Sequence, residues 1–190
     1  MPTRGFSDSI FFIGFRSLAV VSETETPETS SSAVPPLSAA AQKVQDALTA
    51  SGFPYSVMES PVETRTAKDA ARLVKCDVAQ IAKSLIFKSA TGKGVLVITS
   101  GANQVNEFRI GMLLKEALEK APASFVRQQT GFAVGGIPPL AHTSPMETFI
   151  DEDLLKQKEI WAAGGTANAL FKLLPADLVK MTGGRVVKVT

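Results

Sequence analysis

Two short segments of the sequence carry residues that could do chemistry together. The first is Ile81–Phe87, an apolar, strand-like run with a single lysine, Lys83, near its start. The second contains Gly135 and Gly136, followed by Ile137-Pro138-Pro139. Two adjacent glycines let main-chain N–H and C=O groups approach a small molecule without a Cβ in the way, and two adjacent prolines restrict the loop to few conformations. The pair predicts a binding site in which a lysine faces a ligand held by backbone groups.

The composition narrows the chemistry that such a site could perform. The chain has 190 residues, of which 45% are hydrophobic and 20% are charged, as in a single globular domain. It has one cysteine, Cys76, and one histidine, His142, so an internal disulfide is excluded and we expect no zinc cluster. The sequence has no Gly-x-Ser-x-Gly motif and offers no obvious nucleophile. The mildly basic net charge of +2 permits contact with RNA without demonstrating it.

The first 36 residues differ in composition from the rest. Ile10–Phe15 is apolar but far shorter than the roughly 20 residues of a membrane-spanning helix, and Arg16 follows it directly. Residues 22–36 are acidic, rich in serine and threonine, and interrupted by proline, as in disordered linkers. We therefore predict a disordered extension over 1–36, or a weak mitochondrial targeting segment, and one folded domain over 37–190. The expected location is cytoplasmic, with mitochondrial as the alternative.

Cap and turn residues divide the folded part into helices and strands. Ser38, Thr66, Asp77 and Asn106 each precede a helical pattern and can cap it, and Pro175 suits the first turn of a last helix. The helix after Asn106 is expected to extend to residue 118. Strands are predicted at residues 55–58, 85–88, 95–99, 124–126, 132–134, 148–150, 159–162 and 170–173, with 85–88 and 95–99 paired as an antiparallel hairpin. The pattern predicts an α+β fold with a curved mixed β-sheet flanked by helices.

Five segments occur in an order that points to a known family. They are Lys83–Ile86, Thr99–Asn106, Thr130–Pro139, Phe149–Asp151 and Pro175–Leu178. Together they resemble the YbaK family of aminoacyl-tRNA deacylases, which is related to the editing domain of bacterial prolyl-tRNA synthetase. The resemblance covers about Ser38 to Thr190. It implies a barrel-like mixed sheet flanked by helices, hydrolysis in trans of the ester between a wrong amino acid and tRNA, usually tRNA for proline, and no metal or nucleotide cofactor.

The resemblance also implies roles for individual residues. Lys83 is expected near the 3′-terminal adenosine and the scissile ester, and Gly135 is expected to fix substrate groups through its main chain, so both are catalytic candidates. The substrate-binding candidates are Ser84, Asn103, Asn106, Gly136, Ile137, Pro138, Pro139 and His142. Plainer interpretations stay open for them: a solvated rim lysine, an ordinary turn, loop or cap residues, and a serine that only completes a hydrogen bond at a strand end.

Four positions depart from the cysteine-selective members of the family. Those members carry aromatic residues where Val57 and Thr66 stand, a serine at Ala163 and an acid at Leu170. The resemblance therefore leaves alanine, serine, threonine or another small amino acid open. We expect an enzyme that acts on mischarged aminoacyl-tRNA, with prolyl-tRNA synthetase as a candidate partner and no membrane contact. The alternatives are a non-catalytic module that binds aminoacylated tRNA or a synthetase, and a small-molecule-binding regulatory protein on the same fold.

Overall fold

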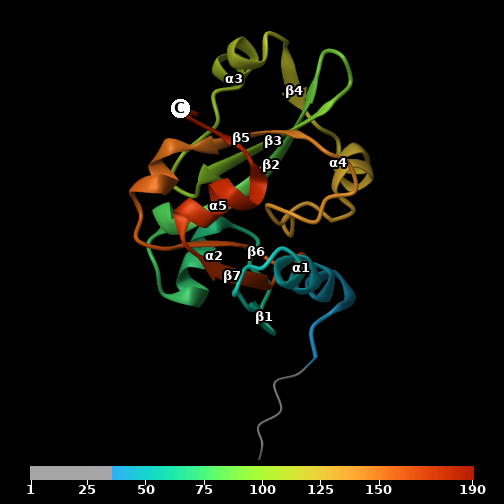
Figure 1. The fold of residues 1–190 in the computed structure, drawn as a ribbon. Helices are drawn as coiled ribbons and strands as arrows, with labels where there is room; N and C mark the ends of the chain where they lie inside the picture. Colours follow the sequence, from blue (N-terminus) through green and yellow to red (C-terminus); the bar gives the residue numbers. More distant parts are fainter. Residues whose placement is uncertain (1–35) are drawn as a thin grey trace, which may run out of the picture. The chain divides into compact units, whose positions relative to one another are not determined.

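The computed structural model describes residues 36–190, so the expectations for residues 1–35 lie outside the described part. The helices are α1 (Ala39–Ala50), α2 (Ala67–Val74), α3 (Glu107–Leu114), α4 (Ala123–Thr130) and α5 (Pro175–Thr182), with the 3-10 helices η1 (Val78–Gln80) and η2 (Glu152–Lys156). The strands are β1 (Val57–Glu59), β2 (Ile81–Ser89), β3 (Gly94–Ser100), β4 (Leu118–Lys120), β5 (Glu147–Asp151), β6 (Ile160–Ala163), β7 (Ala169–Leu173) and β8 (Arg185–Val187). The predicted α+β class with a mixed sheet is confirmed (Figure 1).

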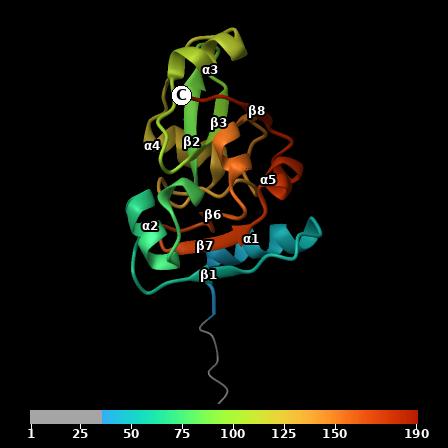
Figure 2. The same ribbon diagram turned by 90° about the vertical axis from the view of Figure 1, so that its left-hand side faces the viewer.

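The eight strands form one sheet with β2 near its middle. Their order is β1-β7-β6-β2-β3-β5-β8, and β4 pairs with β2 outside this order. β2 and β3 form the predicted antiparallel hairpin, in which Lys83 lies opposite Thr99. β6 runs parallel to β2, and β5 runs parallel to β3. β1 and β7 run across the direction of β2 and β3, so the sheet is strongly twisted (Figure 2).

Side-chain caps begin the helices where the sequence predicts them. Ser38 accepts a hydrogen bond from the Ala41 N–H group, and Thr66 forms a reciprocal capping box with Asp69. Asp77 caps η1, which leads directly into β2 and makes Lys83 the third residue of that strand. Local hydrogen bonds therefore determine where β2 begins, and with it the place of Lys83 within the strand. No helix among residues 36–190 combines the length and apolar character needed to cross a membrane.

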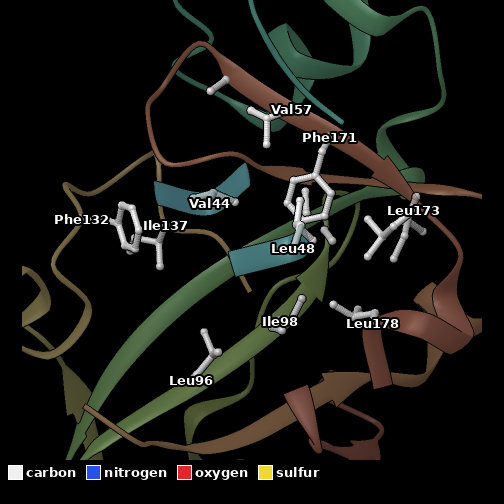
Figure 3. Packing of buried hydrophobic residues seen from close by; sticks show 14 of the residues in the cluster. Val44, Leu48, Val57, Leu96, Ile98, Phe132, Ile137, Phe171, Leu173 and Leu178 are labelled. Atoms are coloured by element: carbon white, nitrogen blue, oxygen red, sulfur yellow. The ribbon is translucent and has the colours of Figure 1, made fainter. Parts of the chain in front are cut away.

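The main hydrophobic core lies between the sheet and α1. Val44 and Leu48 of α1 are fully buried, four residues apart on one helix face. Leu48 and Phe171 of β7 belong to one buried cluster, and Ile137 extends into this cluster from the loop after α4 (Figure 3). Burying a side chain of this size stabilises a fold by about 1.5–3 kcal/mol. The core thus anchors the Gly135-Gly136 loop through its next residue.

Two predicted strands are absent from the segment before this loop. Residues 124–126 belong to α4, because Val126 and Thr130 are buried on one helix face and Gly131 ends the helix in the left-handed region at φ 79°. Residues 132–134 form no strand, and residues 133–136 form a turn closed by a 3.1 Å hydrogen bond from the Gly136 N–H group to the Ala133 carbonyl. Tertiary burial of the helix face outweighed the strand propensity of this segment.

The helix after Asn106 is shorter than predicted. It ends at Leu114, where Lys115 takes a left-handed conformation at φ 62° and donates its N–H to the carbonyls of the last turn. Leu118 begins β4, a three-residue strand that pairs with the end of β2. β4 and β8 were both missed from sequence, since three residues are too few to show a strand pattern.

Candidate active site

A cavity of about 460 Å³ opens beside β2. Its wall comes from four regions: residues 81–87 of β2, residues 64–70 around the start of α2, residues 120–137 around α4, and residues 163–170 around the turn between β6 and β7. Four of the predicted site residues line it, namely Lys83, Ser84, Gly135 and Ile137. The fold therefore brings the lysine segment and the glycine loop together, as the sequence predicted.

One edge of β2 is unpaired along this cavity. On the side away from β3, the first two residues of β2 pair with β6 and the last three pair with β4, while Lys83–Ile86 have no strand partner among the described residues. The Ser89 N–H group donates to the Lys93 carbonyl at 2.9 Å, so the odd-numbered residues of β2 direct their main chain toward β3. By alternation, the N–H and C=O groups of Ser84 and Ile86 face the cavity and can bind a ligand.

Lys83 is a partly buried cation at the wall of the cavity. Its Nζ donates a hydrogen bond to the main-chain carbonyl of Asn103 at 2.9 Å. Burial lowers the pKa of Lys83, and the negative charge of Asp151 acts in the opposite direction. Within residues 36–190, no carboxylate forms an ion pair with Lys83 at 4.0 Å or less. An ammonium group has three N–H donors, so two stay available to a bound group.

Ser84 contributes a buried hydroxyl that lacks a protein partner. Its Oγ makes no hydrogen bond with any residue in the described part of the chain. The interpretation that Ser84 only completes a hydrogen bond at a strand end is therefore wrong. A buried polar atom without a partner costs about 1–3 kcal/mol, and a polar ligand group in the cavity would remove that cost.

The two positions of the loop require glycine for different structural reasons. Gly135 lines the cavity and has φ 96°, a conformation that L side chains rarely adopt. A Cβ at Gly136 would lie 2.6 Å from the Cα of Thr166, so only glycine allows the two loops to approach so closely. Gly135 therefore provides the turn, and Gly136 joins it to the opposite wall.

The other predicted site residues lie outside the cavity wall. Pro138 is buried, and its carbonyl lies 2.7 Å from Nε2 of His142, whose pKa is lowered by burial. Pro139 is buried beside it, and Asn106 caps α3 through the Arg109 N–H group. Asn103 contacts Lys83 through its carbonyl. Direct contact of these residues, or of Gly136, with a substrate stays a prediction.

Sequence reasoning pointed to Ala163 and Leu170 as departures from cysteine-selective members, but it missed the rest of the wall between β6 and β7. Ala163, Thr166 and Ala167 line the cavity there, and the Gly164-Gly165 pair between them was the available signal. A Cβ at Gly165 would lie 2.5 Å from the Ala40 carbonyl oxygen, so this loop packs directly on α1. The second glycine pair thus has the same role as the first: it lets backbone segments approach closely.

The charged lining of the cavity is entirely cationic. Arg65, Lys83 and Lys120 contribute to the wall, and none of the described lining residues is aspartate, glutamate, histidine or cysteine. Such a wall favours an anionic ligand, and it offers Ser84 no side-chain base that would make it a nucleophile. The arrangement suits attack by water, with charge stabilised by Lys83 and main-chain N–H groups.

Comparison with known proteins identifies the family. Residues 62–181 match the model of the aminoacyl-tRNA editing domain. The chain belongs to this family of editing domains. The resemblance to YbaK proteins drawn from five sequence segments is thereby confirmed.

Relatives of this editing domain include both solved structures and a bacterial protein. A crystal structure described as a proposed trans-editing enzyme for prolyl tRNA synthetase is 43% identical, with a TM-score of 0.78 over 82% of this chain and 99% of the other. A structure from a study of epitope grafting onto scaffold proteins is 41% identical, with a TM-score of 0.78 over 81% of this chain and 99% of the other. The YwhH protein of Bacillus subtilis (strain 168) is 23% identical over 130 residues, which are 68% of this chain and 83% of YwhH.

Three of the four positions that the family resemblance sets apart from cysteine-selective members lie on the wall of this cavity. Thr66, Ala163 and Leu170 line it directly. Val57 does not, but it is buried in the adjoining core, where its Cγ1 would lie 2.7 Å from a Cβ at Gly164. Three of the four departures can therefore change which ligand the cavity accepts.

Proposed function

We propose that this editing domain hydrolyses the ester bond of mischarged aminoacyl-tRNA in trans, with tRNA for proline as the carrier. One observation carries the proposal: a partly buried lysine without an ion-pair partner among the described residues lines a cavity beside an unpaired strand edge. Membership of the editing-domain family supports it, as does the 43% identity to a protein described as acting with prolyl tRNA synthetase.

The reaction requires few groups beyond those in the wall. Water attacks the carbonyl carbon of the ester, and the bond from that carbon to the ribose oxygen of the terminal adenosine breaks. The ribose oxygen takes a proton, and the amino acid leaves with a free carboxylate. Lys83 and the main-chain N–H groups of Ser84 or Ile86 stabilise the negative charge that develops on oxygen. Stabilisation of this kind needs no nucleophilic side chain.

The cavity wall is largely apolar and suits an uncharged aminoacyl group. Small side chains in the wall, including Ala67, Ala82, Ala163 and Ala169, leave room for that group. The unpartnered hydroxyl of Ser84 adds one polar contact for the substrate amine or for a hydroxyl of its side chain. A synthetase rejects an amino acid smaller by one methylene by only about 10- to 200-fold, so a second site that hydrolyses what fits is the expected remedy.

Two exposed cations lie where the RNA would approach. Arg65 and Lys120 line different parts of the cavity wall, and both are exposed, although Arg65 also pairs with Glu63 at 3.6 Å. Phosphates at the 3′ end of tRNA are the natural ligands for such side chains. The open cavity also favours the enzyme over the non-catalytic module, which would not need space beside Lys83. Prolyl-tRNA synthetase stays a candidate partner.

A panel of charged tRNAs tests this function directly. The protein is incubated with tRNA for proline carrying alanine, serine, threonine, cysteine or proline, and loss of the ester is followed at pH 7. We expect fast loss for one or more small amino acids and little for proline, with an about 10²–10³-fold lower rate for Lys83→Ala. Tight binding of these tRNAs without any ester loss would overturn the proposal in favour of the non-catalytic module.

A further inference from the structure

A buried carboxylate lies behind the lysine of the proposed site. Asp151, the last residue of β5, is only 1% exposed, and it does not line the cavity. The register that pairs Lys83 with Thr99, and Ile98 with Ile150, places Lys83, Thr99 and Asp151 in one row across three strands. Neighbours in such a row project from the same face of the sheet. The sheet therefore brings a negative charge toward the lysine from the side away from the cavity.

The carboxylate of Asp151 accepts four hydrogen bonds. Its Oδ2 accepts from Thr99 Oγ1 at 3.1 Å, from the Ser100 N–H group at 3.0 Å and from Asn103 Nδ2 at 2.8 Å. Its Oδ1 accepts from the Asp153 N–H group at 3.1 Å. This set joins the end of β3, the turn that follows it and the start of η2. A carboxylate with this many donors is held in a single orientation.

Asn103 connects this network to the lysine. Its Nδ2 donates to Asp151 and, at 2.7 Å, to Asp153, which fixes the orientation of the amide because only its nitrogen can donate to carboxylates. Its N–H group donates to the Ser100 carbonyl at 3.0 Å, and its carbonyl accepts from Lys83 Nζ at 2.9 Å. An unbroken series of hydrogen bonds thus runs from Asp151 through Asn103 to the ammonium group.

We propose that Asp151 and Asn103 are positioning residues for Lys83: Asp151 holds the turn whose carbonyl fixes the ammonium group, and its charge keeps that group protonated beside the cavity. The proposal rests on the proposed function, in which Lys83 stabilises charge on the substrate. Neither residue needs to contact the substrate. Asn103, a substrate-binding candidate by sequence, acts here through the lysine.

The charges around Lys83 support this role for Asp151. Burial lowers the pKa of Lys83, and the negative charge of Asp151 raises it. Asp153 joins the network through the Asn103 side chain, and Lys156 forms an ion pair with Asp153 at 2.5 Å. Removing the charge of Asp151 should therefore let Lys83 lose its proton at a lower pH than in the parent protein.

The first test follows the lysine itself and needs no substrate. Lysine side chains are labelled with ¹³C at Cε, the Lys83 signal is assigned by its loss in Lys83→Met, and its titration is followed by NMR. In Asp151→Asn, Lys83 should titrate at lower pH than in the parent. Tyr55→Phe is the control, because it removes a hydroxyl that accepts from the Leu174 N–H group away from the cavity. Equal titration of Lys83 in parent and Asp151→Asn proteins would overturn the electrostatic half of the proposal.

The second test uses alanine-charged tRNA for proline as the probe. Asn103→Ala keeps the buried charge of Asp151 but frees the turn, so kcat should fall by about 10- to 100-fold while KM stays near the parent value. A raised KM at unchanged kcat would mean that Asn103 binds substrate directly, which would overturn the positioning role. This variant also serves if Asp151→Asn does not fold. A parent protein that hydrolyses no charged tRNA would refute the proposed function, whereas the NMR titration would still report on Asp151 and Lys83.

Discussion

Replacing Lys83 by methionine should separate catalysis from stability. Methionine has nearly the length of lysine but no charge, so the variant removes the ammonium group and fills its place with an apolar side chain. The change deletes the hydrogen bond from Nζ to the Asn103 carbonyl. If Lys83 stabilises the developing charge of the reaction, the rate falls while the fold persists.

The expected magnitudes follow from the contacts of Lys83. A hydrogen bond with a charged donor contributes about 1.5–3 kcal/mol to stability. Its loss is offset because a partly buried charge no longer has to be desolvated, and because burial of one methyl group stabilises by roughly 0.8 kcal/mol. We therefore expect the free energy of unfolding to change by less than about 2 kcal/mol. Loss of one positioned charge-stabilising donor lowers the rate by about 10²–10³-fold, or about 2.7–4 kcal/mol in the activation barrier.

Lys88→Met supplies the matched control on the same strand. Lys88 lies outside the cavity wall and pairs with Glu119 on the surface at 3.2 Å, an interaction that contributes about 0–1 kcal/mol. The assay is single-turnover hydrolysis of the best charged tRNA in the panel, together with urea unfolding of each protein. The reasoning is refuted if Lys83→Met hydrolyses the ester within about threefold of the parent rate, or if Lys88→Met loses as much activity.

Three further predictions concern the loop, the rim and the histidine. Gly135→Ala should lower the free energy of unfolding by about 1–2 kcal/mol, because a φ of 96° strains any L residue. The new Cβ would meet no clash, since it would lie 4.0 Å from the Ala167 Cβ. An unchanged midpoint of urea unfolding would contradict this prediction. Lys120→Ala should weaken tRNA binding and reduce the slope of log affinity against log salt by about 0.7, and an unchanged slope would exclude a phosphate contact. Burial lowers the pKa of His142, so the unfolded chain binds the extra proton and stability falls as pH drops below the ordinary value of 6.5. His142→Asn should remove this loss between pH 6.5 and 5.5 in urea unfolding, and an equal loss in parent and variant would refute it.

Local signals in the sequence were sufficient for the parts of the fold that depend on neighbouring residues. Thr66 and Asp69 form their capping box because they are three residues apart. Asp77 and Gln80 have the same spacing and form a capping box at η1, just before β2. The hairpin of β2 and β3 follows from two β-rich runs joined by a short connection. Each of these features is closed by contacts within a few residues, so propensity and pattern predict it.

Where local preferences compete, burial and strand pairing determined the secondary structure of the segment. Residues 124–126 have strand-forming side chains, but α4 forms because Val126 can then be buried in the main core. β4 has three residues and exists because the end of β2 offers it a partner. Such choices depend on what the rest of the molecule presents to the segment, and a single sequence does not contain that information in local form.

The candidate site also combines features that the sequence predicts with features that only the tertiary structure shows. Residue types paired the Lys83 segment with the Gly135 loop, and the family resemblance added Ser84 and Ile137, all of which line the cavity. Only the tertiary structure provided the unpaired edge of β2, the wall from the Gly164-Gly165 turn, and the carboxylate of Asp151 behind the lysine. These features arise where strands distant in sequence meet, because hydrogen-bond pairing and close packing across the sheet determine which groups stay free and which charges become neighbours.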